Sequence, residues 1–192
     1  MKKVLVVVDV QKDFYHPDGA LYVKGGEVLP ERIAKVIPQF NKVVFTADWH
    51  PINHCSFKEN GGIWPIHCVE FTEGASFPKE FTPYIKNNVV IKGECYEEEE
   101  YGAPPFNIIN YSGTWIDEGY EIVFCGIAGD YCLRETIDLM IAYKKIRKSL
   151  NFPDKEPNKI SVYLDGVASI DDGTTIREFM KENNIEEWKP QE

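Results

Sequence analysis

Cys132 stands at a position in the sequence that favours a reactive thiol. An apolar run at 122–125 predicts a buried parallel strand, and a glycine-containing turn at 126–129 separates it from an amphipathic segment that predicts a helix over 131–149. The first N–H groups of a helix lack backbone partners and favour a negative charge such as a thiolate. The alternative interpretation is that Cys132 is a small buried apolar residue, as most free cysteines are. Position alone leaves both interpretations open.

Charged side chains follow the other predicted strands. They are Asp9, after 4–8; Asp48, after 43–46; Lys92, after 88–91; and Asp165, after 160–164. In a mainly parallel sheet these strand ends lie at one edge, where ligands bind. A charged residue after one strand shows only that the strand has reached the surface. Several such ends, with aspartate, lysine and cysteine among them, indicate a site.

The chemistry that these residue types can carry out together is amide hydrolysis through a covalent thioester. Lys92 would hold the thiolate by its charge, and Asp9 would take the thiol proton and later pass it to the departing ammonia. Backbone N–H groups near Ala128 and Cys132 would hold the oxyanion of the tetrahedral intermediate. A Cys–His dyad is the weaker alternative, because His16 is not near a cysteine motif.

A second group of candidate residues lies in the segment 48–83, which is long, irregular and rich in Gly, Pro, His and aromatic residues. Asp48 and His50 are two positions apart, so in extended backbone their side chains point the same way. His54 and His67 follow, which places three of the chain's four histidines beside one aspartate. This set predicts a site for zinc, manganese or ferrous iron, with water in the open positions. Cys55 and Cys68 are weaker candidate ligands, because the sequence has no CxxC spacing.

Strands and helices alternate along the chain. The predicted strands are 4–8, 43–46, 88–91, 122–125 and 160–164, and the predicted helices are 29–40, 108–118, 131–149 and 174–182. This alternation predicts a single-domain three-layer α/β/α sandwich with a mainly parallel sheet, a Rossmann-like fold. The segment 94–110 departs from the pattern. Its run of glutamates at 97–100 predicts an exposed acidic insertion with a solvated face rather than a metal site.

The bulk properties exclude several classes of protein. The 192 residues suffice for one domain, over 1–192, and are few for two. A formal charge of −10 argues against a nucleic-acid partner. No apolar run approaches the roughly 20 residues of a membrane span, and Asp9 ends the first run too early for a signal peptide. Five cysteines without framework spacing predict free thiols in a reducing cytoplasm. The sequence leaves open whether the chain forms a homo-oligomer.

Five blocks of the sequence resemble the nicotinamidases, or pyrazinamidases, of the isochorismatase-like hydrolase superfamily. They are VVDVQKDF at 7–14, TADWHPINHCSF at 46–57, WPIHCV at 64–69, IKG at 91–93 and CGIAGDYC at 125–132. The blocks follow the order of the family and are specific as a set, although the first and last occur across the whole superfamily. The resemblance implies an isochorismatase-like fold and the hydrolysis of nicotinamide to nicotinate and ammonia in NAD salvage. Pyrazinamide is implied as a side substrate.

The resemblance also assigns roles to single residues. It implies a catalytic triad of Asp9, Lys92 and Cys132, and an oxyanion hole from the N–H groups of Ala128 and Cys132, with a cis peptide bond before Ala128. The metal ligands of the family correspond to Asp48, His50 and His67, with His54 a fourth ligand in some members. The aromatic residues of the substrate pocket correspond to Phe14, Trp64 and Tyr111. One divalent ion, Zn²⁺ with Fe²⁺ or Mn²⁺ as alternatives, would bind the pyridine nitrogen and position the ring rather than activate water.

Two other hypotheses stand beside this one. A relative with the same fold and triad would act on an isochorismate-like vinyl ether or an N-carbamoyl amide, but such relatives lack the ligands matched here by Asp48, His50 and His67. A non-enzymatic module would use the histidines as a structural zinc clip and the cysteines as redox sensors. The segment 94–110 departs from the family at the mouth of the pocket, where it would bear on the substrate range and the oligomeric contacts.

Overall fold

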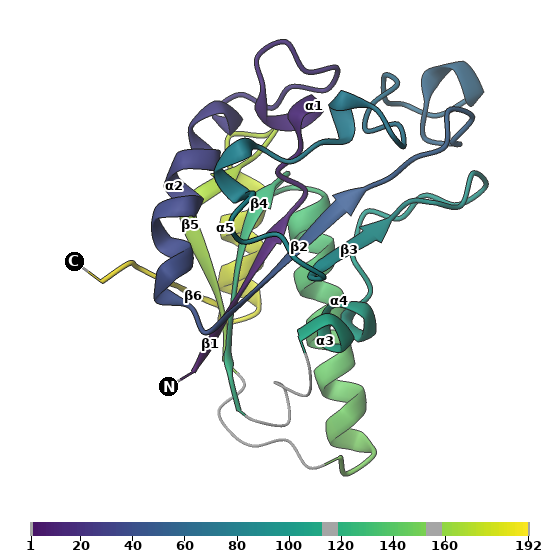
Figure 1. Ribbon diagram of the computed structural model, residues 1–192. Coiled ribbons are helices and arrows are strands. Elements are labelled where there is room, and N and C mark those ends of the chain that lie inside the picture. The colour runs from purple at the N-terminus through teal and green to yellow at the C-terminus, as the bar shows by residue number, and fades with distance from the viewer. Residues whose placement is uncertain (1, 113–118, 153–158, 192) are drawn as a thin grey trace.

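A six-stranded parallel sheet forms the centre of the molecule (Figure 1). The computed structural model describes residues 2–112, 119–152 and 159–191, and within them the strand order is β3-β2-β1-β4-β5-β6. The strands are β1 (Lys3–Val8), β2 (Lys42–Asp48), β3 (Val89–Lys92), β4 (Glu121–Ile127), β5 (Ile160–Ala168) and β6 (Glu186–Glu187). The central strands β1 and β4 are buried on both faces, because each is a nearly continuous run of apolar residues.

Helices cover both faces of the sheet, as Figure 1 shows. They are α1 (Lys12–Tyr15), α2 (Leu29–Val36), α3 (Pro105–Ser112), α4 (Cys132–Ser149) and α5 (Thr174–Glu182). Short 3-10 turns are η1 (Gly26–Val28), η2 (Ile37–Gln39), η3 (Lys58–Asn60), η4 (Glu73–Ala75) and η5 (Lys79–Phe81). Helices α3, α4 and α5 share one apolar core with the sheet, and α2 shares the other with the loop between β2 and β3. The predicted three-layer α/β/α fold is confirmed.

Two predictions about the C-terminal part of the chain were wrong. The strand predicted to end at residue 164 continues to Ala168, because β5 bulges against β4 between Phe124 and Gly126 and then resumes its pairing. Asp165 therefore lies exposed within β5 and does not belong to the site. Strand β6 was not predicted, since its two exposed glutamates have no apolar pattern.

The predicted helix 108–118 begins earlier than expected. Helix α3 starts at Pro105, inside the segment 94–110 that the sequence indicated as an insertion, and Ile108 is fully buried against the core. Residues 113–118 of that prediction lie outside the described part of the chain.

Two further findings concern the cysteines and the helices. All five cysteines lie in the described ranges and are free thiols, as predicted. None of the helices in those ranges combines the length and the apolarity that a membrane crossing requires.

Candidate active site

Four neighbouring strands deliver the predicted catalytic and metal-binding residues to one edge of the sheet. Asp9 follows β1, Asp48 and Lys92 end β2 and β3, and Cys132 begins α4 after the turn that follows β4. All four residues are buried. The strand order reverses between β1 and β4, and the carboxyl edge at such a reversal is where α/β sheets bind ligands.

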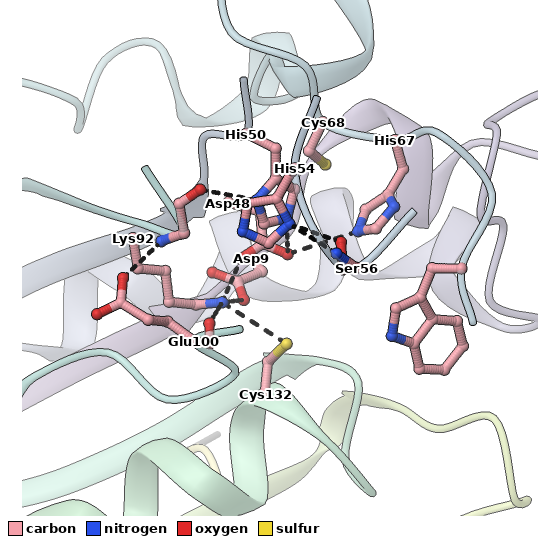
Figure 2. Close-up of polar contacts among 12 residues, drawn as sticks. Asp9, Asp48, His50, His54, Ser56, His67, Cys68, Lys92, Glu100 and Cys132 are labelled. Atoms are coloured by element: carbon pink, nitrogen blue, oxygen red, sulfur yellow. Dashed lines mark hydrogen bonds and ion pairs between the residues drawn. The ribbon is translucent and has the colours of Figure 1, made fainter. Parts of the chain in front are cut away.

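The ammonium group of Lys92 lies at the centre of this group (Figure 2). It donates hydrogen bonds to Oδ1 of Asp48, to the carbonyl of Glu100 at 3.3 Å and to Sγ of Cys132 at 3.7 Å. Its Nζ also lies 2.9 Å from Oδ2 of Asp9. Burial alone would lower the pKa of Lys92, but the carboxylates of Asp48 and Asp9 raise it well above its usual value. The lysine therefore remains a cation.

Burial has the largest effect on the pKa values of the other two triad residues, Asp9 and Cys132. It raises the pKa of Asp9 to about 6, although Lys92 acts in the opposite direction. It also raises the pKa of the Cys132 thiol well above its usual value, and the charge of Lys92 offsets only part of this increase. In the free protein, burial thus opposes the thiolate that the helix terminus and Lys92 favour. The thiol proton needs a base, and a carboxylate oxygen of Asp9 lies within 4.8 Å of Sγ.

Asp48, His50 and His67 form a second buried group whose ligand atoms converge. Oδ2 of Asp48 lies 3.6 Å from Nε2 of His50 and 4.0 Å from Nε2 of His67. The other ring nitrogens donate to backbone carbonyls: Nδ1 of His50 to Gly93 at 2.9 Å, and Nδ1 of His67 to Pro65 at 2.8 Å. Both Nε2 atoms are therefore left with a free lone pair. Two imidazoles and one carboxylate in this orientation fit a divalent transition metal such as zinc.

Gly93 connects the two groups. Its φ is 70°, which favours glycine, and a Cβ at this position would lie 2.4 Å from Cε1 of His50. The preceding residue, Lys92, serves the triad through its side chain, while the carbonyl of Gly93 holds the ring of His50. A side chain at position 93 would displace that imidazole.

His54 is buried beside Asp48, His50 and His67, but it does not belong to the set whose ligand atoms converge. Its Nδ1 lies 2.7 Å from Oγ of Ser56, and its Nε2 lies 3.1 Å from the carbonyl of Glu98. The His54 ring packs on that of His50, with centroids 4.1 Å apart. Both of its ring nitrogens therefore have partners in this arrangement, and its role as a fourth ligand stays a prediction.

A pocket opens beside Cys132, and aromatic residues form much of its wall. The ring centroid of Phe14 lies 5.4 Å from that of His67, and Trp64 packs edge-on against Tyr131 at 5.1 Å. The predicted pocket residues Phe14 and Trp64 are thus both in the wall. The side chain of the third, Tyr111, lies outside the described part of the structure, although its backbone belongs to α3.

Part of the segment 94–110 belongs to the site, so the prediction of a wholly exposed insertion was wrong. The hydroxyl of Tyr101 accepts a hydrogen bond from Nε1 of Trp64 at 3.0 Å, and a carboxylate oxygen of Glu100 accepts one from the N–H of Gly93 at 2.9 Å. These contacts require tertiary structure, because the glutamate run has no apolar pattern that would predict them. Two pocket residues that the sequence did not indicate also come from this segment: they are Glu99 and Tyr101.

The turn after β4 contains the cis peptide bond that the resemblance implied. The peptide bond between Ile127 and Ala128 is cis. Cys132 is the first residue of α4, where an N–H group has no intrahelical acceptor. The carbonyl of Ala128 accepts hydrogen bonds from the N–H groups of Tyr131 and Leu133, which ties the turn to the start of the helix.

Comparison with known proteins places this site in a family. The model of the isochorismatase domain matches residues 3–140, and the chain therefore belongs to the isochorismatase family. Nicotinamidase of Saccharomyces cerevisiae is 30% identical to it over an alignment of 173 residues, and the match covers 70% of this chain and 79% of the yeast protein. Within the family, the chain is a hydrolase similar to the nicotinamidases.

Solved structures agree with this placement. PnC1 from L. infantum in complex with nicotinate has a TM-score of 0.77 and 31% identity, and the match covers 98% of this chain and 92% of that one. Pyrazinamidase of Pyrococcus horikoshii in complex with zinc has a TM-score of 0.72 and 29% identity, with 98% and 99% covered.

Proposed function

We propose that the protein hydrolyses nicotinamide to nicotinate and ammonia through a thioester on Cys132. The observation that carries the proposal is the buried cluster of thiol, ammonium and carboxylate beside three convergent metal ligands. The similarity to nicotinamidases supports a pyridine carboxamide as the substrate. The group of Asp48, His50 and His67 speaks against isochorismate-like or N-carbamoyl substrates.

The pocket is suited to hold a pyridine ring. A divalent metal on Asp48, His50 and His67, most simply zinc, would supply a Lewis acid for the ring nitrogen when it is bound. Phe14 and Trp64 offer apolar surface to the ring itself. The carboxamide would then reach the side of the pocket where Cys132 lies.

In the acylation step Sγ of Cys132 attacks the carboxamide carbon, and the thiol proton moves to Asp9. The backbone N–H groups of Ala128 and Cys132 would hold the resulting oxyanion. The intermediate collapses as the C–N bond breaks, Asp9 returns the proton to the leaving nitrogen, and ammonia departs. The raised pKa of Asp9, about 6, makes it a stronger base than an ordinary aspartate.

In the deacylation step water attacks the thioester, and Asp9 takes one of its protons. The C–S bond then breaks, nicotinic acid leaves and loses its proton to solvent to give nicotinate, and the proton held by Asp9 returns to the sulfur of Cys132. Lys92 transfers no proton in either step, since neighbouring carboxylates hold its pKa high. Its role is to balance negative charge on the sulfur.

The test is to incubate purified, zinc-loaded protein with nicotinamide and to measure ammonia and nicotinate in equal amounts. Rapid quenching followed by peptide mass spectrometry should detect a nicotinoyl group on Cys132. Removal of the metal by a chelator should suppress turnover, and added zinc should restore it. Pyrazinamide should be hydrolysed as well, and the reaction would serve NAD salvage in the cytoplasm. A zinc-loaded sample that releases no ammonia from either amide would refute the proposal.

A further inference from the structure

Thr46 is a fully buried residue of β2 that touches Asp9 twice. Its hydroxyl donates a hydrogen bond to Oδ1 of Asp9 at 2.5 Å, and its backbone carbonyl accepts one from the N–H of Asp9 at 3.2 Å. Asp9 has a φ of 48°, an uncommon conformation for a residue other than glycine. The neighbouring strand thus fixes both the backbone and one carboxylate oxygen of Asp9.

The two carboxylate oxygens of Asp9 have different surroundings. Oδ1 accepts the hydrogen bond from Thr46. Oδ2 forms an ion pair with Lys92, whose Nζ lies 2.9 Å away, and no hydroxyl or backbone N–H group of the described residues donates to it.

Oδ2 is therefore the oxygen that no hydroxyl group holds. It is buried, it lies near the cation, and it belongs to a carboxylate with an oxygen within 4.8 Å of the Cys132 sulfur. If the hydroxyl of Thr46 were absent, Oδ1 would also lack its partner, and the carboxylate could rotate about its Cβ–Cγ bond, a torsion with broad energy wells. Either oxygen would then be able to turn toward Lys92 or away from the thiol.

We infer that Thr46 is a positioning residue for the general base: its hydroxyl occupies Oδ1 of Asp9, so that Oδ2 alone receives the thiol proton. This inference rests on the proposed function, because it assigns a step of that reaction. Among the described residues, the hydrogen bond of the Thr46 side chain goes to Asp9 and not to the sulfur or the metal ligands. Removal of the Thr46 hydroxyl should therefore lower the rate of proton transfer and leave substrate binding unchanged.

Two matched pairs of variants isolate the hydroxyl group. Thr46→Val replaces it with a methyl group of similar size, and valine suits a buried strand. Thr46→Ser and Thr46→Ala differ from each other only by the hydroxyl. We expect kcat for nicotinamide to fall about 10- to 100-fold in the Val and Ala variants, since general-base catalysis contributes at least this much. The Ser variant should keep kcat within about threefold of the wild type, and KM should stay within about twofold in all three.

Ser161→Ala is the control for a lost buried hydroxyl. Its Oγ donates to the carboxylate of Glu121 at 2.9 Å on the strands β5 and β4, away from the pocket, so its removal should lower stability without lowering kcat. The inference is overturned if Thr46→Val keeps its kcat, if Thr46→Ser falls as far as Thr46→Ala, or if KM rises while kcat is constant. Inactive wild-type protein would instead refute the proposed function, so the two failures are distinguishable.

Discussion

The two halves of the site are held in place by different means. The triad half, Asp9, Lys92 and Cys132, is held by charge: one ammonium group faces two carboxylates and a thiol. The metal half, Asp48, His50 and His67, is held by the backbone, because each imidazole donates its Nδ1–H to a main-chain carbonyl. Gln11 adds to this by accepting from the N–H of Asp48 and donating to its carbonyl, both at 2.8 Å.

The difference fits the proposed tasks of the halves. Proton transfer needs groups whose charges can change during the reaction, and neighbouring charges tune such groups. Metal binding needs donor atoms whose positions do not change, and hydrogen bonds to the main chain supply that rigidity. The following substitutions separate the halves, and they are ordered from the largest expected effect to the smallest.

Cys132→Ala should stop hydrolysis while the metal half stays intact. We expect kcat to fall by about 10⁵-fold or more, because no other group can form the thioester. Zinc content, measured by atomic spectrometry, and nicotinamide binding, measured by calorimetry, should be unchanged. Cys95→Ala is the control, since Cys95 is an exposed thiol. Residual turnover close to that of the wild type would rule out the covalent mechanism.

Lys92→Met should damage both halves, because Lys92 is the residue that they share. Activity should fall at least about 10³-fold, and two buried carboxylates would lose their cation. Breaking such a pair costs about 3–5 kcal/mol in the free energy of unfolding. Urea unfolding with a chelator present would measure this loss, and added zinc should restore part of it by binding the folded state.

The control for Lys92→Met is Lys12→Met. Lys12 pairs with Glu73 at the surface, where its side chain is 30% exposed and that of Glu73 is 80% exposed. Its loss should leave the unfolding midpoint unchanged. Equal losses of stability in the two variants would show that the buried ion pairs of the site contribute no more to stability than a surface ion pair does.

His67→Ala should affect the metal half and leave the triad half in place. We expect zinc affinity to fall by about 100-fold or more and kcat/KM for nicotinamide to fall with it. The rate at which iodoacetamide alkylates Cys132 should remain close to that of the wild type. His16→Ala, outside both halves, is the control. A large change in the alkylation rate would mean that the two halves are coupled more tightly than their contacts indicate.

Trp64→Phe tests the pocket wall and should have the smallest effect. It keeps an aromatic ring but removes the hydrogen bond to Tyr101, so KM for nicotinamide should rise about two- to tenfold with little change in kcat. Trp188→Phe is the matched control, because Trp188 packs against Phe40 and Tyr163, away from the pocket. A fall in kcat greater than the rise in KM would assign Trp64 a role in the reaction itself.

The sequence was sufficient to predict most of the fold and the residues at the strand ends. Continuous apolar runs such as 4–8 and 122–125 fix strands, and the residues that follow them must lie at the carboxyl edge of a parallel sheet. Strand ends of this kind place Asp9, Lys92 and Cys132 at one edge of the sheet. The prediction for Asp165 was wrong, because a bulge lets β5 continue past the Asp-Gly pair at which the strand was expected to end.

Features that depend on tertiary contacts could not be predicted. Burial raises the pKa of the Cys132 thiol, and a local pattern cannot reveal how far desolvation outweighs the charge of Lys92. In the same way, Glu100 and Tyr101 belong to a run that reads as solvent-exposed, and only the path of the chain brings them to Gly93 and Trp64.

The Lys92–Gly93 pair has a consequence for protein engineering. Because adjacent residues of one short stretch serve the sulfur through a side chain and an imidazole through a carbonyl, a small backbone displacement there would disturb both. If this pocket is transferred to another scaffold, or its metal preference is altered, the two residues and their backbone conformation should be kept together. Libraries that vary it one position at a time would yield mostly inactive clones.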